Sequence, residues 1–266
     1  MTTFSTLELD QTPQGVATLW LNRPDTHNAF NAVMIAELSE ALQQLASQPH
    51  VRLLLLRGRG THFSAGADLA WMQASVGLGL EGNLADARTL SNLLYTLYTF
   101  PVPTLAVVQG AAYGGAVGLA SCCDMAIGTD TAVFSLSEVR LGLAPAVISP
   151  YVVRAIGARA ARRYTLTAHR FNAERAQALG LLAEVYPHEE LAAAVAQWST
   201  TLLNNGPAAL KASKALLHEV EQTALNATLR RTTEQVIAGL RTGAEGQEGI
   251  KAFLEKRPPQ WPGAAL

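Results

Sequence analysis

Two glycine-containing loops have the residue types that let a backbone do chemistry. Val108 to Asp124 (VQGAAYGGAVGLASCCD) has four glycines and no acid or base before its final residue, and Gly58 to Met72 (GRGTHFSAGADLAWM) has three glycines. Each follows a strand-like run and opens a helix-like one. Free N–H groups at a helix N-terminus attract negative charge, so two such loops facing one point would form a two-donor oxyanion hole.

The same glycines could serve only tight turns and close helix packing. Neither loop has the spacing of a dinucleotide fingerprint or a P-loop, and no G-x-S-x-G elbow is present. Ser64 and Ser121 could be recruited into a serine hydrolase, but neither lies at a recognisable nucleophile turn.

The sequence gives no sign of a metal or redox cofactor. The adjacent Cys122 and Cys123 lack metal-site spacing and are expected to be small apolar core residues. The histidines form no ligand pair with carboxylate or cysteine support; they are His27, His50, His62, His169, His188 and His218.

The elements that must position these loops alternate between strands and helices. Strands are expected at 15–22, 51–58 and 103–110, and helices at 31–47 and 84–100, which predicts an α/β core. After about Tyr186 the pattern is almost wholly helical. We therefore predict an α/β core over 1–195 and a helical C-terminal region over 196–266.

Composition limits the partners. A net charge of −1 and a pI near 6.6 give no basic field for nucleic acid. The N-terminus lacks the pattern of a signal peptide, so a cytoplasmic protein is expected. Val102 to Ile127 is long enough to cross a bilayer, but a buried strand and helix give the same hydropathy, and we expect no membrane span.

Five segments resemble, in order and spacing, the signature segments of the enoyl-CoA hydratase/isomerase (crotonase) family. They are LNRPDTHNAFN, FSAGADLAWM, VQGAAYGGAVGLASCCDMAIG, FSLSEVRLGLAP and EGIKAFLEKRPPQW. The resemblance covers nearly the whole chain. It implies a spiral of ββα units with a helical trimerisation region, assembled as a trimer or as a hexamer of two trimers.

The resemblance also implies an acyl-CoA thioester as substrate, with coenzyme A as part of the substrate and no separate cofactor. The thioester oxygen would lie between the N–H groups of Ala67 and Gly115, which would stabilise an enolate.

The family's CoA-binding positions fall on residues at two ends of the chain. Ala65, Asp68 and Leu69 match the adenine-binding turn, and Arg23 matches a basic residue near the phosphates. Asp68 could equally be a helix N-cap, and Arg23 a solvated charge. At the other end, Phe253 and Lys256 match a segment that reaches the CoA of a neighbouring subunit, although Phe253 could pack internally and Lys256 be solvated.

Glu138 matches a catalytic glutamate of the family that exchanges a proton at C2. Burial in an apolar pocket would raise its pKa, which suits proton transfer near neutral pH. Without the resemblance, Glu138 could be a helix-start residue paired with Arg140.

The second glutamate of the family's hydratases falls on Gly118, which we expect to enlarge the pocket. Positions 146–149 (AVIS) also depart from the family's glycine-rich helix start. Three explanations remain. Glu138 could handle both proton and water in a hydration, helped by another group or by the substrate's own carboxylate. The protein could instead be a one-glutamate double-bond isomerase, or a non-catalytic protein that binds acyl-CoA or assembles with a partner. We expect hydration.

Within the family, GADLAWM and LAPAVISPYVV are similar to bacterial 3-methylglutaconyl-CoA and γ-carboxygeranoyl-CoA hydratases of leucine and acyclic terpene breakdown. A 3-branched, carboxylated enoyl-CoA is therefore the expected substrate. A buried substrate carboxylate needs a partner or a wet pocket. Within the core the partner could be a hydroxyl, backbone N–H groups or an arginine, for which Arg88, Arg140 and Arg154 are candidates.

Overall fold

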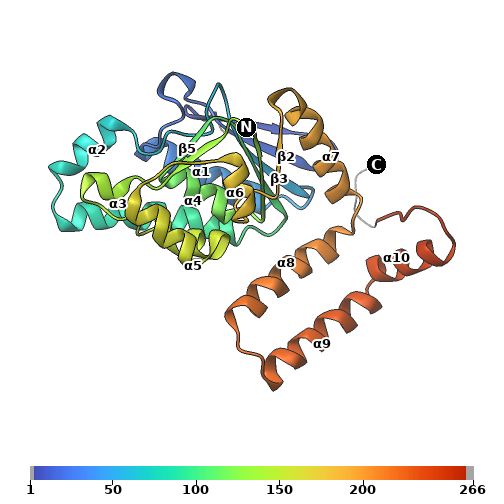
Figure 1. Ribbon diagram of the computed structural model, residues 1–266. Coiled ribbons are helices and arrows are strands. Elements are labelled where there is room, and N and C mark those ends of the chain that lie inside the picture. The colour runs from blue at the N-terminus through green and yellow to red at the C-terminus, as the bar shows by residue number, and fades with distance from the viewer. Residues whose placement is uncertain (1–2, 262–266) are drawn as a thin grey trace.

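The computed structural model describes residues 3–261 and contains two β-sheets (Figure 1). The larger sheet has the strand order β1 (Leu7–Gln11), β2 (Val16–Leu21), β3 (Leu53–Gly58), β4 (Thr104–Val108), β6 (Met125–Thr129) and β9 (Glu184–Tyr186). Only the β1–β2 pair is antiparallel. The smaller sheet has the order β5 (Ala111–Tyr113), β7 (Val133–Ser135) and β8 (Phe171–Asn172).

Helices connect the strands and cover the sheets. They are α1 (Ala32–Ala46), α2 (Leu69–Val76), α3 (Leu80–Tyr98), α4 (Gly115–Cys122), α5 (Ser149–Thr167), α6 (Ala173–Ala178) and α7 (Leu191–Leu203), with short 3₁₀ turns η1 (Pro24–Thr26), η2 (Glu138–Leu141) and η3 (His188–Glu190). The predicted α/β core is confirmed, whereas the division into two sheets was not expected from the sequence.

The larger sheet is buried on both faces, which explains its uninterrupted apolar strands. Along β3, Leu54 and Leu56 pack into the main core with α1, while Leu53 and Leu55 pack on the opposite face with Val195 of α7. Helix α7 therefore belongs to the core. The boundary predicted between 195 and 196 falls inside this helix, and the next break in the chain lies between α7 and α8.

Three helices form an arm that extends away from the α/β layers (Figure 1): α8 (Pro207–Gln222), α9 (Ala227–Thr242) and α10 (Ala244–Leu254). A part-buried ion pair joins the arm to the core, because the Lys214 Nζ lies 2.7 Å from Asp124 Oδ2 and donates to the Val102 carbonyl at 3.1 Å. Lys214 is thus a structural residue.

The long apolar stretch around the glycines divides into β4, β5, α4 and β6. None of the helices within residues 3–261 is long and apolar enough to cross a membrane. Cys122 and Cys123 are buried free thiols, as expected, and burial raises the pKa of the Cys123 thiol to about 12.

Candidate active site

Backbone hydrogen bonds hold the two glycine-containing loops side by side. The Ser64 N–H donates to the Ala111 carbonyl at 3.0 Å, and the Ser64 carbonyl accepts from the Tyr113 N–H at 3.1 Å. The Phe63 N–H also donates to the Gln109 carbonyl at 2.7 Å. The two loops are therefore adjacent, as a two-donor oxyanion hole between them requires.

The N–H groups of Ala67 and Gly115 are available to a ligand. Phe30 forms hydrogen bonds on both sides of Ala67. Its N–H donates to the Gly66 carbonyl, and its carbonyl accepts from the Asp68 N–H. Gly115 is the first residue of α4, where a helix leaves its N–H without an internal partner. Within residues 3–261, neither N–H has a hydrogen-bond acceptor.

Glu138 lies beside these donors at the start of η2, and Gly114 is what lets it approach. Gly114 has φ +53°, and a Cβ atom there would stand 3.0 Å from Glu138 Oε1. Any other residue would be strained and would crowd the carboxyl group.

The Glu138 carboxyl is partly buried, and its Oε2 atom is buried without a hydrogen-bond partner among the described residues. Burial raises the pKa of Glu138 above its ordinary value, against a smaller lowering by its own N–H. The alternative of a pair with Arg140 is not observed, because the Arg140 guanidinium donates to the Ala168 carbonyl at 2.9 Å.

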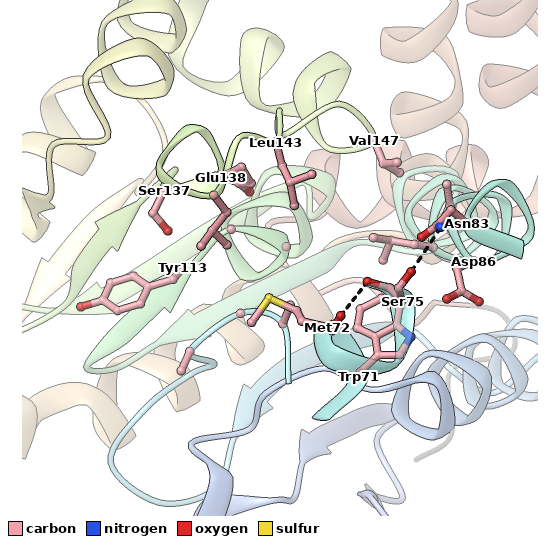
Figure 2. A pocket seen from close by; sticks show the side chains of 18 residues that line it. Trp71, Met72, Ser75, Asn83, Asp86, Tyr113, Ser137, Glu138, Leu143 and Val147 are labelled. Atoms are coloured by element: carbon pink, nitrogen blue, oxygen red, sulfur yellow. Dashed lines mark hydrogen bonds between the residues drawn. The ribbon is translucent and has the colours of Figure 1, made fainter. Parts of the chain in front are cut away.

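Two cavities meet at this carboxyl group. The α3 cavity, of ≈ 360 Å³, extends past Met72 to Asn83 and Asp86 of α3 (Figure 2). The apolar cavity, of ≈ 190 Å³, extends toward Phe30 and Ile148. The two share six lining residues: Ala67, Trp71, Leu90, Gly115, Glu138 and Val147.

Ile148 occupies the space beside Gly118. A Cβ atom on Gly118 would stand 2.3 Å from Ile148 Cγ2, and Ile148 is only 3 % exposed. Gly118 itself lines neither cavity. The expectation that this glycine enlarges the pocket was wrong. The space left by the missing side chain at position 118 is filled by Ile148, which lies in the segment 146–149 that departs from the family pattern.

The four CoA-binding residues expected in the core come together in a third hollow of ≈ 860 Å³, the Arg23 groove. It is lined by Arg23, Ala65, Asp68 and Leu69, and it shares Ala65, Ala67 and Trp71 with the α3 cavity. The groove thus leads to the two N–H donors.

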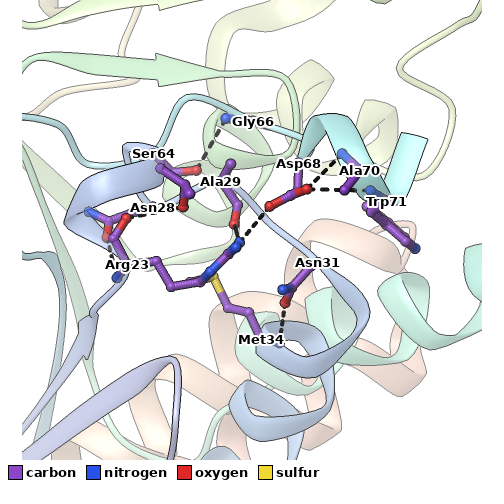
Figure 3. A network of polar contacts seen from close by, with 11 residues as sticks. Arg23, Asn28, Ala29, Asn31, Met34, Ser64, Gly66, Asp68, Ala70 and Trp71 are labelled. Atoms are coloured by element: carbon purple, nitrogen blue, oxygen red, sulfur yellow. Dashed lines mark hydrogen bonds and ion pairs between the residues drawn. The ribbon is translucent and has the colours of Figure 1, made fainter. Parts of the chain in front are cut away.

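Asp68 is the helix N-cap that the sequence offered as an alternative, and it also forms an ion pair that the sequence did not predict. Its Oδ1 caps α2 by accepting from the N–H of Ala70 at 2.9 Å, and its Oδ2 pairs with Arg23 at 2.9 Å (Figure 3). The hydrogen bond from Arg23 is the main cause that lowers the Asp68 pKa. Because Arg23 also donates to the Ala29 carbonyl, its guanidinium is held in place at the groove.

Phe253 and Lys256 lie in the helical arm and line none of these hollows. Phe253 is 82 % exposed, so the alternative of internal packing does not hold within this chain. Their expected contact is with a neighbouring subunit, and it stays a prediction.

The three arginines considered for a substrate carboxylate do not reach either cavity. Arg140 is occupied as described above, Arg154 pairs with Glu221 at 3.1 Å, and Arg88 is exposed on α3. Among the described residues, no arginine or lysine lines the α3 cavity or the apolar cavity. None of the three arginine candidates is therefore placed to pair with an acyl group in these cavities.

A serine hydrolase finds no support in the geometry. Ser64 is fully buried, and its Oγ accepts from the Gly66 N–H at 3.2 Å. Across residues 3–261, no serine hydroxyl is hydrogen-bonded to a histidine.

Sequence reasoning missed Asp86, Asn83, Trp71 and Ile148 as lining residues. The helical pattern of α3 predicts which positions are apolar, but the turn of the helix that faces a cavity depends on how α2 and α3 pack. No local signal in the sequence marks these four residues.

Comparison with known proteins agrees with the geometry. Residues 11–264 match the sequence profile of the enoyl-CoA hydratase/isomerase family. A solved enoyl-CoA hydratase from Shewanella pealeana is 46 % identical, with a TM-score of 0.93 over 97 % of this chain and 96 % of that one.

Several relatives, including the following two, are named for a specific hydratase activity. Crotonyl-CoA hydratase of Syntrophomonas wolfei is 34 % identical over 91 % of this chain and 92 % of its own. 2,3-Dehydroadipyl-CoA hydratase of Escherichia coli is 32 % identical over 94 % of this chain and 96 % of its own.

The chain belongs to the enoyl-CoA hydratase/isomerase family and has its crotonase fold. It is an enzyme of the enoyl-CoA hydratase type.

Proposed function

We propose that this enzyme adds water across the 2,3-double bond of an enoyl-CoA, with Glu138 as the only acid–base group. The observation that carries this proposal is the meeting of three groups at one point. Glu138 and the residues that bear the free N–H groups, Ala67 and Gly115, line both cavities.

In this mechanism the N–H groups of Ala67 and Gly115 hold the thioester oxygen. The Glu138 carboxylate accepts a proton from water as the water oxygen attacks C3, which produces an enolate stabilised by the two donors. The carboxylic acid then returns a proton to C2, so the elements of water are added and Glu138 is regenerated. Its raised pKa makes the carboxylate a better base for the first step.

One observation keeps a double-bond isomerase as the second candidate. Among the described residues, Glu138 is the only charged side chain that lines the apolar cavity, and Ile148 fills the space beside Gly118. A single carboxyl suffices to move a proton between C2 and C4. A non-catalytic acyl-CoA-binding protein is the remaining alternative, and the buried unpartnered oxygen of Glu138 argues against it.

We further propose an uncharged acyl group. The 3-branched, carboxylated groups inferred from the subgroup resemblance would meet no cation in either cavity of this chain, and burying an unpaired carboxylate is costly. The expected role in leucine or terpene breakdown depends on those substrates, so this proposal does not include it.

The assembly is also a proposal. Leu217, Ile237 and Phe253 are more than half exposed on the helical arm, which supports burial of the arm in a trimer or hexamer. The mass of the native protein in light scattering would test this.

The test of the function is a panel of enoyl-CoA thioesters with wild-type enzyme and Glu138→Gln. We expect loss of the conjugated thioester absorbance and incorporation of oxygen from labelled water. Glu138→Gln should lower turnover by about 10²–10⁴-fold while acyl-CoA still binds.

Glu174→Gln is the matched control, because Glu174 is an exposed glutamate in the first turn of α6 that lines neither cavity. Near-full activity in Glu138→Gln would remove this residue from the mechanism. Conversion of a 3-enoyl-CoA to a 2-enoyl-CoA without labelled oxygen would favour the isomerase, and binding without turnover the non-catalytic protein.

A further inference from the structure

The α3 cavity has a second carboxylate that the proposed reaction does not use. Asp86 of α3 and Glu138 are the only charged residues among those that line it. Figure 2 shows them on opposite walls of the cavity. Asp86 lines the α3 cavity alone, away from the six residues that it shares with the apolar cavity.

The polar groups next to Asp86 are already occupied by backbone carbonyls. Asn83 Nδ2 donates to the Leu78 carbonyl at 2.9 Å and the Gly79 carbonyl at 3.2 Å, and Ser75 Oγ donates to the Met72 carbonyl at 2.7 Å. In the described part of the chain, Asp86 has no hydrogen bond or ion pair. Its acceptor oxygens and its charge are therefore left to the contents of the cavity.

An acyl tail in this cavity would experience that charge directly. The cavity walls are otherwise mostly apolar, and a carboxylate accepts hydrogen bonds but donates none. A hydroxyl on the tail could donate to Asp86, an alkyl tail would leave it solvated, and a carboxylate would be repelled by it.

We propose that Asp86 is a specificity-determining residue, which selects acyl groups with a hydrogen-bond donor such as a hydroxyl and disfavours acyl groups with a distal carboxylate. The inference rests on the proposed function only in taking the α3 cavity as the site of the acyl group.

The test measures binding of saturated acyl-CoAs, which cannot be hydrated, by calorimetry. The probes are thioesters of four to six carbons that end in a methyl, a hydroxyl or a carboxylate group. Two like charges within a few ångströms at a half-buried site correspond to about ten- to a hundredfold in affinity. We expect wild-type enzyme to bind the carboxylate-ended probes most weakly.

Asp86→Asn keeps the side-chain volume and removes the charge. It should improve the affinity for carboxylate-ended probes relative to methyl-ended probes by about tenfold or more. In the same variant, the affinity of hydroxyl-ended probes relative to methyl-ended probes should decrease. Glu81→Gln is the matched control, since Glu81 is an exposed acid of the same helix outside the cavity, and it should leave these ratios unchanged.

The proposal is overturned if the ratio of affinities for carboxylate-ended and methyl-ended probes is the same in Asp86→Asn as in Glu81→Gln at every chain length. It is also overturned if wild-type enzyme binds carboxylate-ended probes best. Failure of the proposed function would give a different result. Oxygen from labelled water would not be incorporated, while the affinity ratios of the acyl-CoA probes would still change in Asp86→Asn.

Discussion

Replacing Gly118 by alanine should destabilise the protein through its contact with Ile148. The new Cβ atom would stand 2.3 Å from Ile148 Cγ2, whereas ordinary contact begins at 3.4 Å. Helix α4 and the start of α5 must therefore separate by about 1 Å, or Ile148 must leave its rotamer. Overpacking of this kind costs about 1–3 kcal/mol, against a gain of up to about 1 kcal/mol from alanine in a helix. We expect a net loss of about 1–2 kcal/mol in the free energy of unfolding.

A double-mutant cycle with Ile148→Ala separates packing from other effects. Ile148→Ala alone should cost about 2–5 kcal/mol because it empties a buried site. In the double variant the alanine at 118 enters that space, so the combined cost should fall short of the sum by about 1–3 kcal/mol. Urea unfolding at one protein concentration measures all four corners of the cycle, which keeps any contribution of assembly constant.

Gly239→Ala is the control for helix propensity. Gly239 lies in α9 with nothing within 4 Å of the position of a Cβ atom, so this change should stabilise by about 0.5–1 kcal/mol. Additive losses within about 0.5 kcal/mol, or a Gly118→Ala variant as stable as Gly239→Ala, would refute the packing argument.

Two further changes test the core and the site. Lys214→Met should cost about 3–5 kcal/mol, because it leaves the part-buried Asp124 carboxylate without its cation, and adding Asp124→Asn should recover part of this loss in urea unfolding. Glu138→Gln should raise the melting temperature at pH 7 but not near pH 4. Because the pKa of Glu138 is raised in the folded state, its protonated carboxyl group favours folding. This contribution to the free energy of unfolding is fully present below the ordinary pKa of 4.5 and is lost as the pH rises through the folded-state pKa. A melting-temperature difference that does not change with pH would contradict this cause.

The sequence by itself determined the elements and the two glycine-containing loops, whereas the assignment of Ala67 and Gly115 as donors rests on the family resemblance. The alternation of apolar runs with helical periodicity predicted β2, β3, β4, α1 and α3 within a few residues. The glycine pattern located the two loops, because a positive φ at Gly114 leaves few other residues possible there. Both are local properties, so they can be read along the chain.

The tertiary structure decided which side chains share a cavity with those donors. The sequence shows that Gly118 and the segment 146–149 each depart from the family pattern. Only the packing of the folded chain shows that Ile148, from this segment, fills the space beside the glycine. The three arginines considered for a substrate carboxylate do not line the α3 cavity, and Asp86 lines it instead. Such contacts join residues that are far apart along the chain, and their geometry depends on how α3, α4 and the start of α5 pack together, which no local pattern records.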